Sequence, residues 1–232
     1  MRLAQLLFSQ GFGTRQACRD LAAAGRVAID GRVETDADSE LAIDEGAPFA
    51  VDGVPWPFRS QAVVVLHKPA GFECSASPRD HPAVISLLPE PLRRRGTQPV
   101  GRLDADTTGV LLLTDDGALL HRLTSPRRRV EKTYEVTAKH PLDAAQLEAL
   151  VGGVVLRDDP APVRARSAER TGERTLRLVL ETGKYHQVKR MLAAVGNRVE
   201  SLHRSRFAGI GAESLAAGDW RWLTEAERAS LG

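Results

Sequence analysis

From residue 61 onward, the chain carries a series of short β-forming segments with few helical segments between them. The candidate strands are residues 62–67, 110–113, 132–138, 163–167, 175–181 and 199–206. The candidate helices follow Thr114, span residues 144–150 and run from 185 to 195. Consecutive strands without intervening helices do not suit a sheet built only from strand–helix–strand units. This part of the chain therefore predicts an α+β fold with a mixed, mainly antiparallel sheet.

The first 35 residues show a different pattern. Apolar residues at helical spacing predict a first helix over residues 2–10, which the sequence Gly11-Phe12-Gly13 ends. Thr14 is a good N-cap for a second helix that extends to Ala24. Asp30-Gly31 lies between two short apolar segments and predicts a type I′ hairpin turn. Two helices in an αα-hairpin, followed by a small β-hairpin, therefore form a compact N-terminal module.

A linker is expected between these two parts. Pro55, Trp56 and Pro57 interrupt regular structure, which places the boundary within residues 53–60. We therefore predict one domain over residues 1–56 and a second over residues 61–232.

The composition is that of a globular protein with one sizeable core and a small satellite domain. The chain has 232 residues, of which 42% are hydrophobic and 27% are charged. No apolar run approaches the length of a membrane span, and no signal-peptide pattern is present. Cys18 and Cys74 belong to no CxxC pair, which argues against a disulfide or zinc framework. We expect a soluble protein of the cytoplasm without a membrane partner.

The net charge of +2 is unevenly distributed along the chain. Residues 35–52 contain six acidic residues and no Lys or Arg, whereas residues 184–206 contain six basic residues and a single Glu. Two arginine triplets, at residues 93–95 and 127–129, add further positive charge. Such clusters favour a polyanionic partner if they converge in space, although a charge cluster is more often a solvated face.

One segment indicates chemistry directly. Residues 101–109, GRLDADTTG, lead into the apolar segment 110–113 and then into Thr114-Asp115-Asp116-Gly117. A carboxylate at Asp104, next to Arg102 and backed by apolar sequence, should be ionised and can act as a nucleophile or a base. Taken alone, the segment fits a polar turn equally well.

The whole segment 101–117 closely resembles the signature of the RsuA-like pseudouridine synthases, which act on ribosomal RNA. Residues 1–50 resemble an S4 RNA-binding domain, with Thr14 where that family usually has serine. Three more segments are similar to motifs of the synthases: LHKPAG at residues 66–71, EKTYEV at 131–136 and GKYHQVKRM at 183–191. His67 departs from the more usual asparagine of the first of these motifs.

The resemblance implies roles for three residues. It makes Asp104 the catalytic aspartate, places Tyr134 against the target base and pairs Lys189 with Asp104. Without the resemblance, Tyr134 fits ordinary packing in an alternating strand, although its ring can stack on a base and its hydroxyl can transfer a proton. Lys189 lies at the margin of an apolar helix stripe, where a lysine usually extends to solvent.

The resemblance also implies the reaction and its partner. Segments 132–137, 183–197 and 200–204 are most similar to the small-subunit branch of the family, which implies conversion of one uridine of 16S rRNA, at position 516, to pseudouridine. The base must be flipped out before Asp104 acts at C1′, either as a nucleophile or as a base that starts a glycal route. Neither a cofactor nor a metal is implied, and a monomer bound to 16S rRNA or to a small-subunit assembly intermediate is expected.

Nine cations are the candidate RNA contacts in this interpretation: Arg2, Arg15, Arg19, Arg26, Lys68, Arg102, Lys132, Lys184 and Arg190. Arg102, in particular, is expected to support the extruded nucleotide or to fill the space that it leaves. Lys189 is expected to hold the Asp104 carboxylate anionic and oriented.

Three alternatives remain open at this point. A synthase of the same family that acts on 23S rRNA is disfavoured by the YHQVK sequence at residues 185–189. A catalytically idle S4-containing assembly factor is disfavoured because Asp104, Tyr134 and Lys189 are all present. A metal-dependent phosphoesterase that uses the aspartates of residues 104–116 predicts loss of activity with a chelator.

Overall fold

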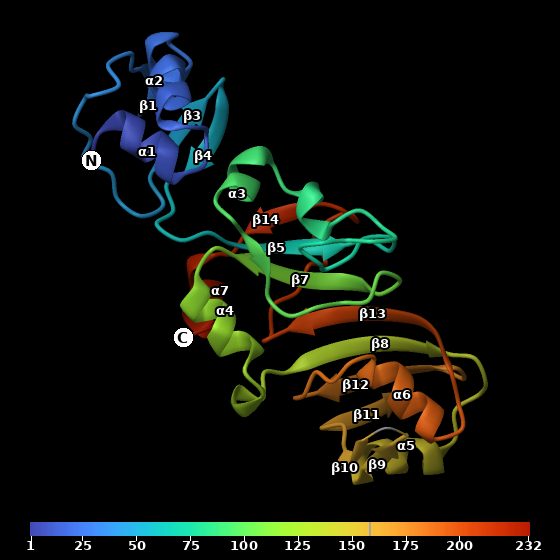
Figure 1. Cartoon of the computed structure of the whole chain (residues 1–232). Helices are drawn as coiled ribbons and strands as arrows, with labels where there is room; N and C mark the ends of the chain where they lie inside the picture. The colour runs from blue at the N-terminus through green and yellow to red at the C-terminus, as the bar shows by residue number, and fades with distance from the viewer. Residues whose placement is uncertain (158) are drawn as a thin grey trace. The chain divides into compact units, whose positions relative to one another are not determined.

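The computed structural model describes residues 1–157 and 159–232, which fold as two compact units (Figure 1). The first unit comprises Met1–Ala62, Ile85–Gln98 and Thr114–Asp116, and the second comprises Val63–Val84, Pro99–Leu113 and Gly117–Gly232. The two predicted domain ranges, 1–56 and 61–232, remain a prediction. The compact units do not follow the chain in two continuous ranges, since short segments from its middle belong to the first unit.

The first unit begins with the predicted pair of helices, α1 (Leu3–Ser9) and α2 (Arg15–Ala23). The Thr14 hydroxyl accepts a hydrogen bond from the Ala17 amide at 3.2 Å, so Thr14 is the N-cap of α2. Strands β1 (Val27–Ile29) and β2 (Arg32–Val33) follow as the predicted hairpin. Asp30 and Gly31 both have positive φ angles, as a type I′ turn requires.

The segment that was predicted to be a linker is instead a strand. Strands β3 (Pro48–Val51) and β4 (Val54–Pro57) form a second hairpin, and the sheet order is β2-β1-β3-β4. Since β4 is the edge strand, prolines at 55 and 57 are tolerated there. The Trp56 side chain is 7% exposed and pairs in register with Phe49. The expectation that Pro55, Trp56 and Pro57 interrupt regular structure was therefore wrong.

Helix α3 (Glu90–Arg94) and the residue that follows it complete the first unit. The Arg95 side chain is only 4% exposed, and its Nε donates a hydrogen bond to Asp115 Oδ2 at 2.6 Å. Its Nη1 donates to the side-chain oxygen of Gln10 and to the carbonyl of Arg59, both at 2.8 Å. One guanidinium thus ties together four segments that are distant in sequence.

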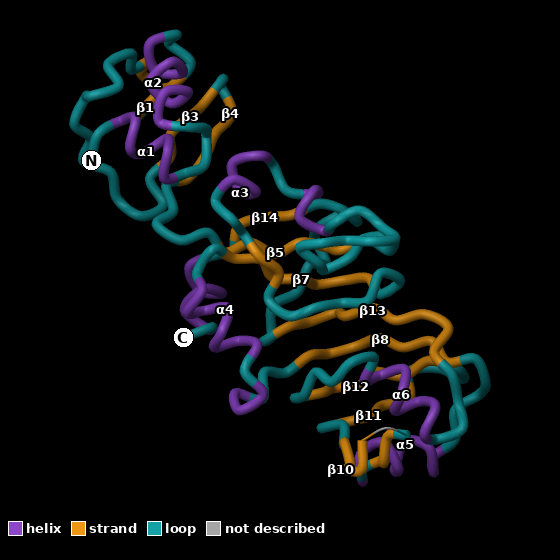
Figure 2. Tube along the Cα trace, viewed as in Figure 1, coloured by secondary structure: helices purple, strands orange, loops and turns teal. Residues whose placement is uncertain are grey.

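The second unit is built on the sheet β11-β12-β8-β13-β7-β5-β14 (Figure 2). The bounds are β5 (Val63–Lys68), β7 (Thr108–Thr114), β8 (Lys132–Ala138), β11 (Ser167–Arg170), β12 (Thr175–Leu180), β13 (Val199–Phe207) and β14 (Trp220–Trp222), with β6 (Gln98–Pro99) paired to β7. Strand β13 runs antiparallel to β8 and parallel to β7. The sheet is therefore mixed and mainly antiparallel, which confirms the predicted α+β class.

Shorter elements surround this sheet. They are η1 (Val84–Leu87), α4 (Gly117–Thr124), η2 (Pro126–Arg128), α5 (Ala144–Gly152), β9 (Val154–Leu156), β10 (Asp159–Val163), α6 (Gln187–Ala194) and α7 (Glu225–Ser230). The predicted strand at 163–167 was wrong, because residues 164–166 separate β10 from β11. None of the described helices is long and apolar enough to cross a membrane.

The hydrophobic core of the second unit lies between the central strands of the sheet and helix α4. Its buried side chains come from β5, β7, β13 and α4 and include Val65, Leu112, Leu119 and Phe207. This packing fixes the position of β7, and with it the end of the loop that leads into β7.

Candidate functional site

The loop before β7 carries Asp104, and Lys68 at the end of β5 shapes that loop. The Lys68 side chain is fully buried, and its Nζ donates to the backbone carbonyls of Pro69, Asp104, Ala105 and Thr107 at 2.9–3.2 Å. Burial lowers the pKa of Lys68. Since its ammonium group is enclosed by protein carbonyls, the predicted RNA contact of Lys68 was wrong, and its role is to position the loop.

Helix α6 supplies the partners of the Asp104 carboxylate. Lys189 Nζ lies 3.1 Å from Oδ2, and His186 Nε2 lies 3.3 Å from Oδ1. The predicted pairing of Lys189 with Asp104 is thus confirmed. Arg102, by contrast, makes no ion pair with Asp104 in the described part of the chain, and its side chain is exposed. The prediction that Arg102 stabilises the carboxylate was therefore wrong.

Lys189 also binds Asp106, whose side chain is 71% exposed. Its Nζ donates to both carboxylate oxygens of Asp106 at 2.7 and 2.8 Å. Burial opposes the change, but the hydrogen bonds and charges of Asp106 and Asp104 raise the pKa of Lys189. The site therefore keeps a protonated lysine between two carboxylates.

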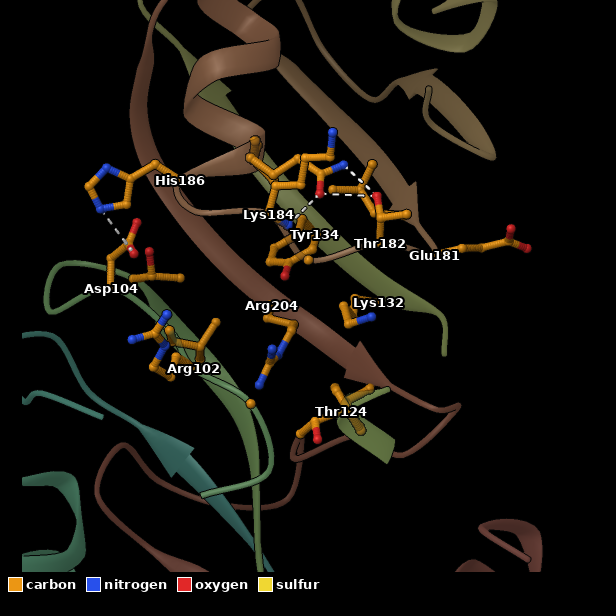
Figure 3. A pocket seen from close by; sticks show the side chains of 18 of the residues that line it. Arg102, Asp104, Thr124, Lys132, Tyr134, Glu181, Thr182, Lys184, His186 and Arg204 are labelled. Atoms are coloured by element: carbon orange, nitrogen blue, oxygen red, sulfur yellow. Dashed lines mark hydrogen bonds and ion pairs between the residues drawn. The ribbon is translucent and has the colours of Figure 1, made fainter. Parts of the chain in front are cut away.

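His186 is held in place by an unusual backbone conformation. It is the N-cap of α6 and has φ 46° and ψ 35°, in the left-handed region that few non-glycine residues adopt. Its ring stacks on the ring of Tyr185 at 3.7 Å between centroids, and the Tyr185 side chain is 70% exposed. This conformation directs the His186 imidazole toward Asp104 (Figure 3).

Asp104 lies at the wall of a cavity of about 340 Å³. Tyr134, Lys132 and Arg204 line the same cavity (Figure 3), together with apolar side chains of β12 and β13. Tyr134 is 8% exposed, so its ring is largely packed within the wall. A planar base that entered this cavity would meet a carboxylate, a phenol ring and two cations.

A close backbone approach joins the two strands that carry the site. Gly109 in β7 pairs with Arg204 in β13, and a Cβ added at Gly109 would lie 2.2 Å from the Arg204 carbonyl oxygen. Gly109 also has a φ of +109°. Only glycine fits here without moving one of the strands.

The predicted RNA-contacting cations of the N-terminal module form ion pairs with the acidic segment. Arg19 and Arg26 make bidentate pairs with Asp38 and Asp52, at 2.9–3.0 Å and 2.6 Å respectively. Arg2 lies 3.5 Å from Asp38. These side chains are about half exposed, so the positive charge is partly compensated but still accessible. Their RNA contacts, and those of Arg15, remain predictions.

The predicted cations of the second unit differ in their surroundings. Lys184 forms an ion pair with Asp159, and Arg190 donates to the Tyr185 carbonyl at 3.0 Å. Arg102, Lys132 and Lys184 line the cavity. The structure thus brings the predicted residues Asp104, Tyr134, Lys189, Arg102, Lys132 and Lys184 to one site.

Sequence reasoning missed two residues of this site. His186 belongs to segment 183–191, which resembles the family, but had no role of its own in the sequence analysis, and Arg204 counted only as one of the six basic residues of segment 184–206. His186 lies three residues before Lys189, but it is the left-handed N-cap of α6, so helix periodicity alone does not place it beside Asp104. No local signal identified Arg204, whose burial depends on strand pairing.

An aspartate that a lysine and a histidine hold at the wall of a cavity lined by further cations suits an enzyme that acts on a negatively charged substrate such as RNA. The match to family models is more specific: residues 62–194 match the family described as RNA pseudouridylate synthase, and residues 1–45 match the S4 domain. The chain belongs to the RNA pseudouridylate synthases.

Individual relatives agree with this assignment. The chain is 42% identical over 236 residues to "Ribosomal small subunit pseudouridine synthase A" of Yersinia pestis, covering 100% of this chain and 98% of the relative. The protein of the same name from Escherichia coli strain K12 is 41% identical over 89% of each chain. A solved structure described as "Crystal structure of pseudouridylate synthase" superposes with a TM-score of 0.71 at 32% identity and covers both chains completely.

Proposed function

We propose that this protein converts one uridine of 16S rRNA to pseudouridine, and that the target is position 516. The observation that carries the proposal is the Asp104 carboxylate, which Lys189 and His186 hold at the wall of a base-sized cavity. The names of the full-length relatives support the small subunit as the substrate.

The geometry suggests how the reaction proceeds. The target nucleotide is flipped into the cavity, where Tyr134 supports the base and the exposed Arg102 forms part of the lining. Asp104 then acts at C1′, either by bonding to that carbon or by removing a proton from C2′, while the N1–C1′ bond breaks. The base turns within the cavity and C5 bonds to C1′, as the Asp104–C1′ bond breaks or the C2′ proton returns. The C5 proton then leaves and N1 gains a proton. The nucleotide keeps its composition, so the reaction requires no external group.

Lys189 and His186 serve this chemistry by fixing the carboxylate. Two donors on separate oxygens restrict the Asp104 side chain to one orientation, and a short loop anchored by Lys68 restricts its backbone. The site is therefore organised before RNA binds.

Pseudouridine mapping tests the proposal. Small-subunit and large-subunit rRNA are incubated separately with the wild-type protein and with Asp104→Asn, then treated with carbodiimide and read by primer extension. We expect one new stop in 16S rRNA that requires Asp104, with RNA affinity unchanged. A stop in 23S rRNA would assign the protein to the large-subunit branch, and the absence of any stop, with RNA binding retained, would favour an assembly factor.

Asp106→Asn provides a matched control, because Asp106 also contacts Lys189 but is mostly exposed. It should retain most of the activity, whereas Asp104→Asn should lose all of it. A chelator should leave the activity unchanged, and inhibition that added metal reverses would favour the phosphoesterase alternative.

A further inference from the structure

Two cations on the sheet floor of the cavity lack a carboxylate partner among the described residues, and the pairing of β8 with β13 brings them together. Arg204 lies opposite Tyr134 in the register, and Phe207 lies opposite Lys132. Directly paired residues of antiparallel strands point to the same face of a sheet. Arg204, Lys132 and Tyr134 therefore share the face that forms the floor of the cavity (Figure 3).

Arg204 is a buried guanidinium with incomplete hydrogen bonding. The residue is 2% exposed, and its Nε donates to the Val110 carbonyl at 2.8 Å. Its Nη2 has no hydrogen-bond partner in the described part of the chain. The guanidinium carbon lies 5.0 Å from the centre of the Phe207 ring. Buried arginines are ordinarily paired with acids or hydrogen-bonded throughout, so this one is incomplete as it stands.

Lys132 is the second cation. Its Nζ donates to the Val130 carbonyl at 2.6 Å and lies 5.8 Å from the centre of the Phe207 ring. Burial and then the charge of Arg204 lower its pKa to about 8, and Glu181 opposes this shift only in part. The Lys132 ammonium thus lies near the guanidinium of Arg204, a charge of the same sign that disfavours its protonated form.

The other lysines near the site do not share this property. Lys184 is paired with Asp159, and Lys189 with Asp104 and Asp106. Arg204 and Lys132, on the sheet floor of the cavity, have no protein carboxylate within ion-pair distance among the described residues. Arg102 lines the cavity too and likewise makes no ion pair there, but its side chain is exposed. Two uncompensated cations in one cavity favour a ligand that carries negative charge.

The reaction itself produces such a ligand, provided that the proposed function is correct. When the N1–C1′ bond breaks, its electron pair stays with the base, which becomes the uracil anion with charge shared by N1 and the carbonyl oxygens O2 and O4. Carbon C1′ is meanwhile bonded to Asp104, or has become part of a double bond after loss of the C2′ proton. The anion must be held while it turns to present C5.

We propose that Arg204 and Lys132 bind the carbonyl oxygens of the detached uracil and stabilise its negative charge during the rotation. The walls favour a base over a phosphate at this position. Leu180, Leu202 and Phe207 line the cavity beside the two cations and offer flat apolar contact, which suits a pyrimidine ring and not a strongly hydrated phosphate.

The test uses the acidity of the leaving base. The target uridine of a short RNA is replaced by 5-fluorouridine, whose base is a stronger acid and so departs more easily as an anion. Consumption of each RNA is followed in single turnovers with the wild type, with Lys132→Met and with Arg204→Lys. Loss of one donor to a developing anion typically lowers the rate about 10²–10³-fold. We therefore expect Lys132→Met to lose about 10²-fold on uridine and distinctly less on 5-fluorouridine.

Two further variants keep the outcome interpretable. Lys132→Arg preserves the charge and should recover most of the rate on uridine. Arg177→Met removes a cation from the opposite face of the same sheet, where it is paired with Glu135, and should behave as the wild type. Arg204→Lys retains a charge in the core, so a folding defect, which circular dichroism would reveal, is less of a concern than with a neutral residue.

Each other outcome overturns the proposal. If Lys132→Met lost the same factor in rate on the uridine RNA and on the 5-fluorouridine RNA, Lys132 would not stabilise the negative charge of the departing base. A weaker RNA affinity with a smaller salt dependence would assign the cations to a phosphate. Full activity of Lys132→Met would show that this cation is not used. A wild-type protein that forms no pseudouridine would instead refute the proposed function, so the two failures are distinguishable.

Discussion

Lys68→Met removes the ammonium group that the loop carrying Asp104 is built around. An ammonium group has three protons, so its four carbonyl contacts amount to about three hydrogen bonds. Each hydrogen bond to a charged group contributes about 1.5–3 kcal/mol, which gives roughly 4.5–9 kcal/mol in total. The substitution also removes the desolvation cost of burying the ammonium ion, on the order of several kcal/mol, which offsets part of this loss of stability. We expect a net loss of about 2–4 kcal/mol in the free energy of unfolding.

Two measurements check this expectation. For a protein of this size, the loss corresponds to a decrease in Tm of roughly 4–16 °C. Because the Lys68 side chain is fully buried, the dependence of RNA affinity on salt should be unchanged. Pseudouridine formation should fall more than RNA affinity does, since the loop that carries Asp104 loses its support.

Arg127→Met is the matched control, because Arg127 is an exposed cation of the same unit. It should leave Tm unchanged whether or not it contacts RNA. The reasoning would be refuted if Lys68→Met kept the wild-type Tm and reduced the slope of affinity against salt by about one phosphate contact. Lys68 would then contact RNA after all.

Three more substitutions test other parts of the structure. Gly109→Ala should destabilise the protein by about 2–4 kcal/mol in thermal denaturation, because a Cβ meets the backbone of β13; an unchanged Tm would contradict the close approach. Arg95→Met should cost about 3–5 kcal/mol by leaving the Asp115 carboxylate without its buried partner, and adding Asp115→Asn should recover part of the loss. Arg221 lowers the pKa of Glu227 to about 2 from an ordinary value of 4.5, so the pair stabilises the fold above pH 4.5 and less as the pH falls toward 2. Glu227→Gln should therefore be less stable by about 1–2 kcal/mol at pH 7 and equal to the wild type near pH 2 in denaturant titrations.

Local signals in the sequence were sufficient for much of the fold. The Thr14 cap and the Asp30-Gly31 turn act within a few residues, and both were predicted correctly. Pro55 and Pro57 were misinterpreted because proline is compatible with a strand only at a sheet edge, and the order of strands is a tertiary property.

The site illustrates the same limit. The pairing of Asp104 with Lys189 came from family resemblance, since no spacing rule relates residues so far apart in the chain. Arg102 lies two residues before Asp104 in sequence but makes no ion pair with it among the described residues, whereas His186 contacts it from another element. Lys68 was predicted to contact RNA, but its side chain is buried and binds backbone carbonyls of the loop. A single sequence does not distinguish a buried lysine from an exposed one.

The position of β13 between β8 and β7 also determines when the enzyme can become active during its synthesis. Both neighbours are translated long before their shared partner, and at about 5–20 residues per second the ribosome needs roughly 3–14 s to proceed from Ala138 to Phe207. During that time Arg204 does not yet exist, and the facing edges of β7 and β8 are open. The N-terminal hairpins and helices, formed from neighbouring residues, can fold well before the nascent chain has a reaction centre.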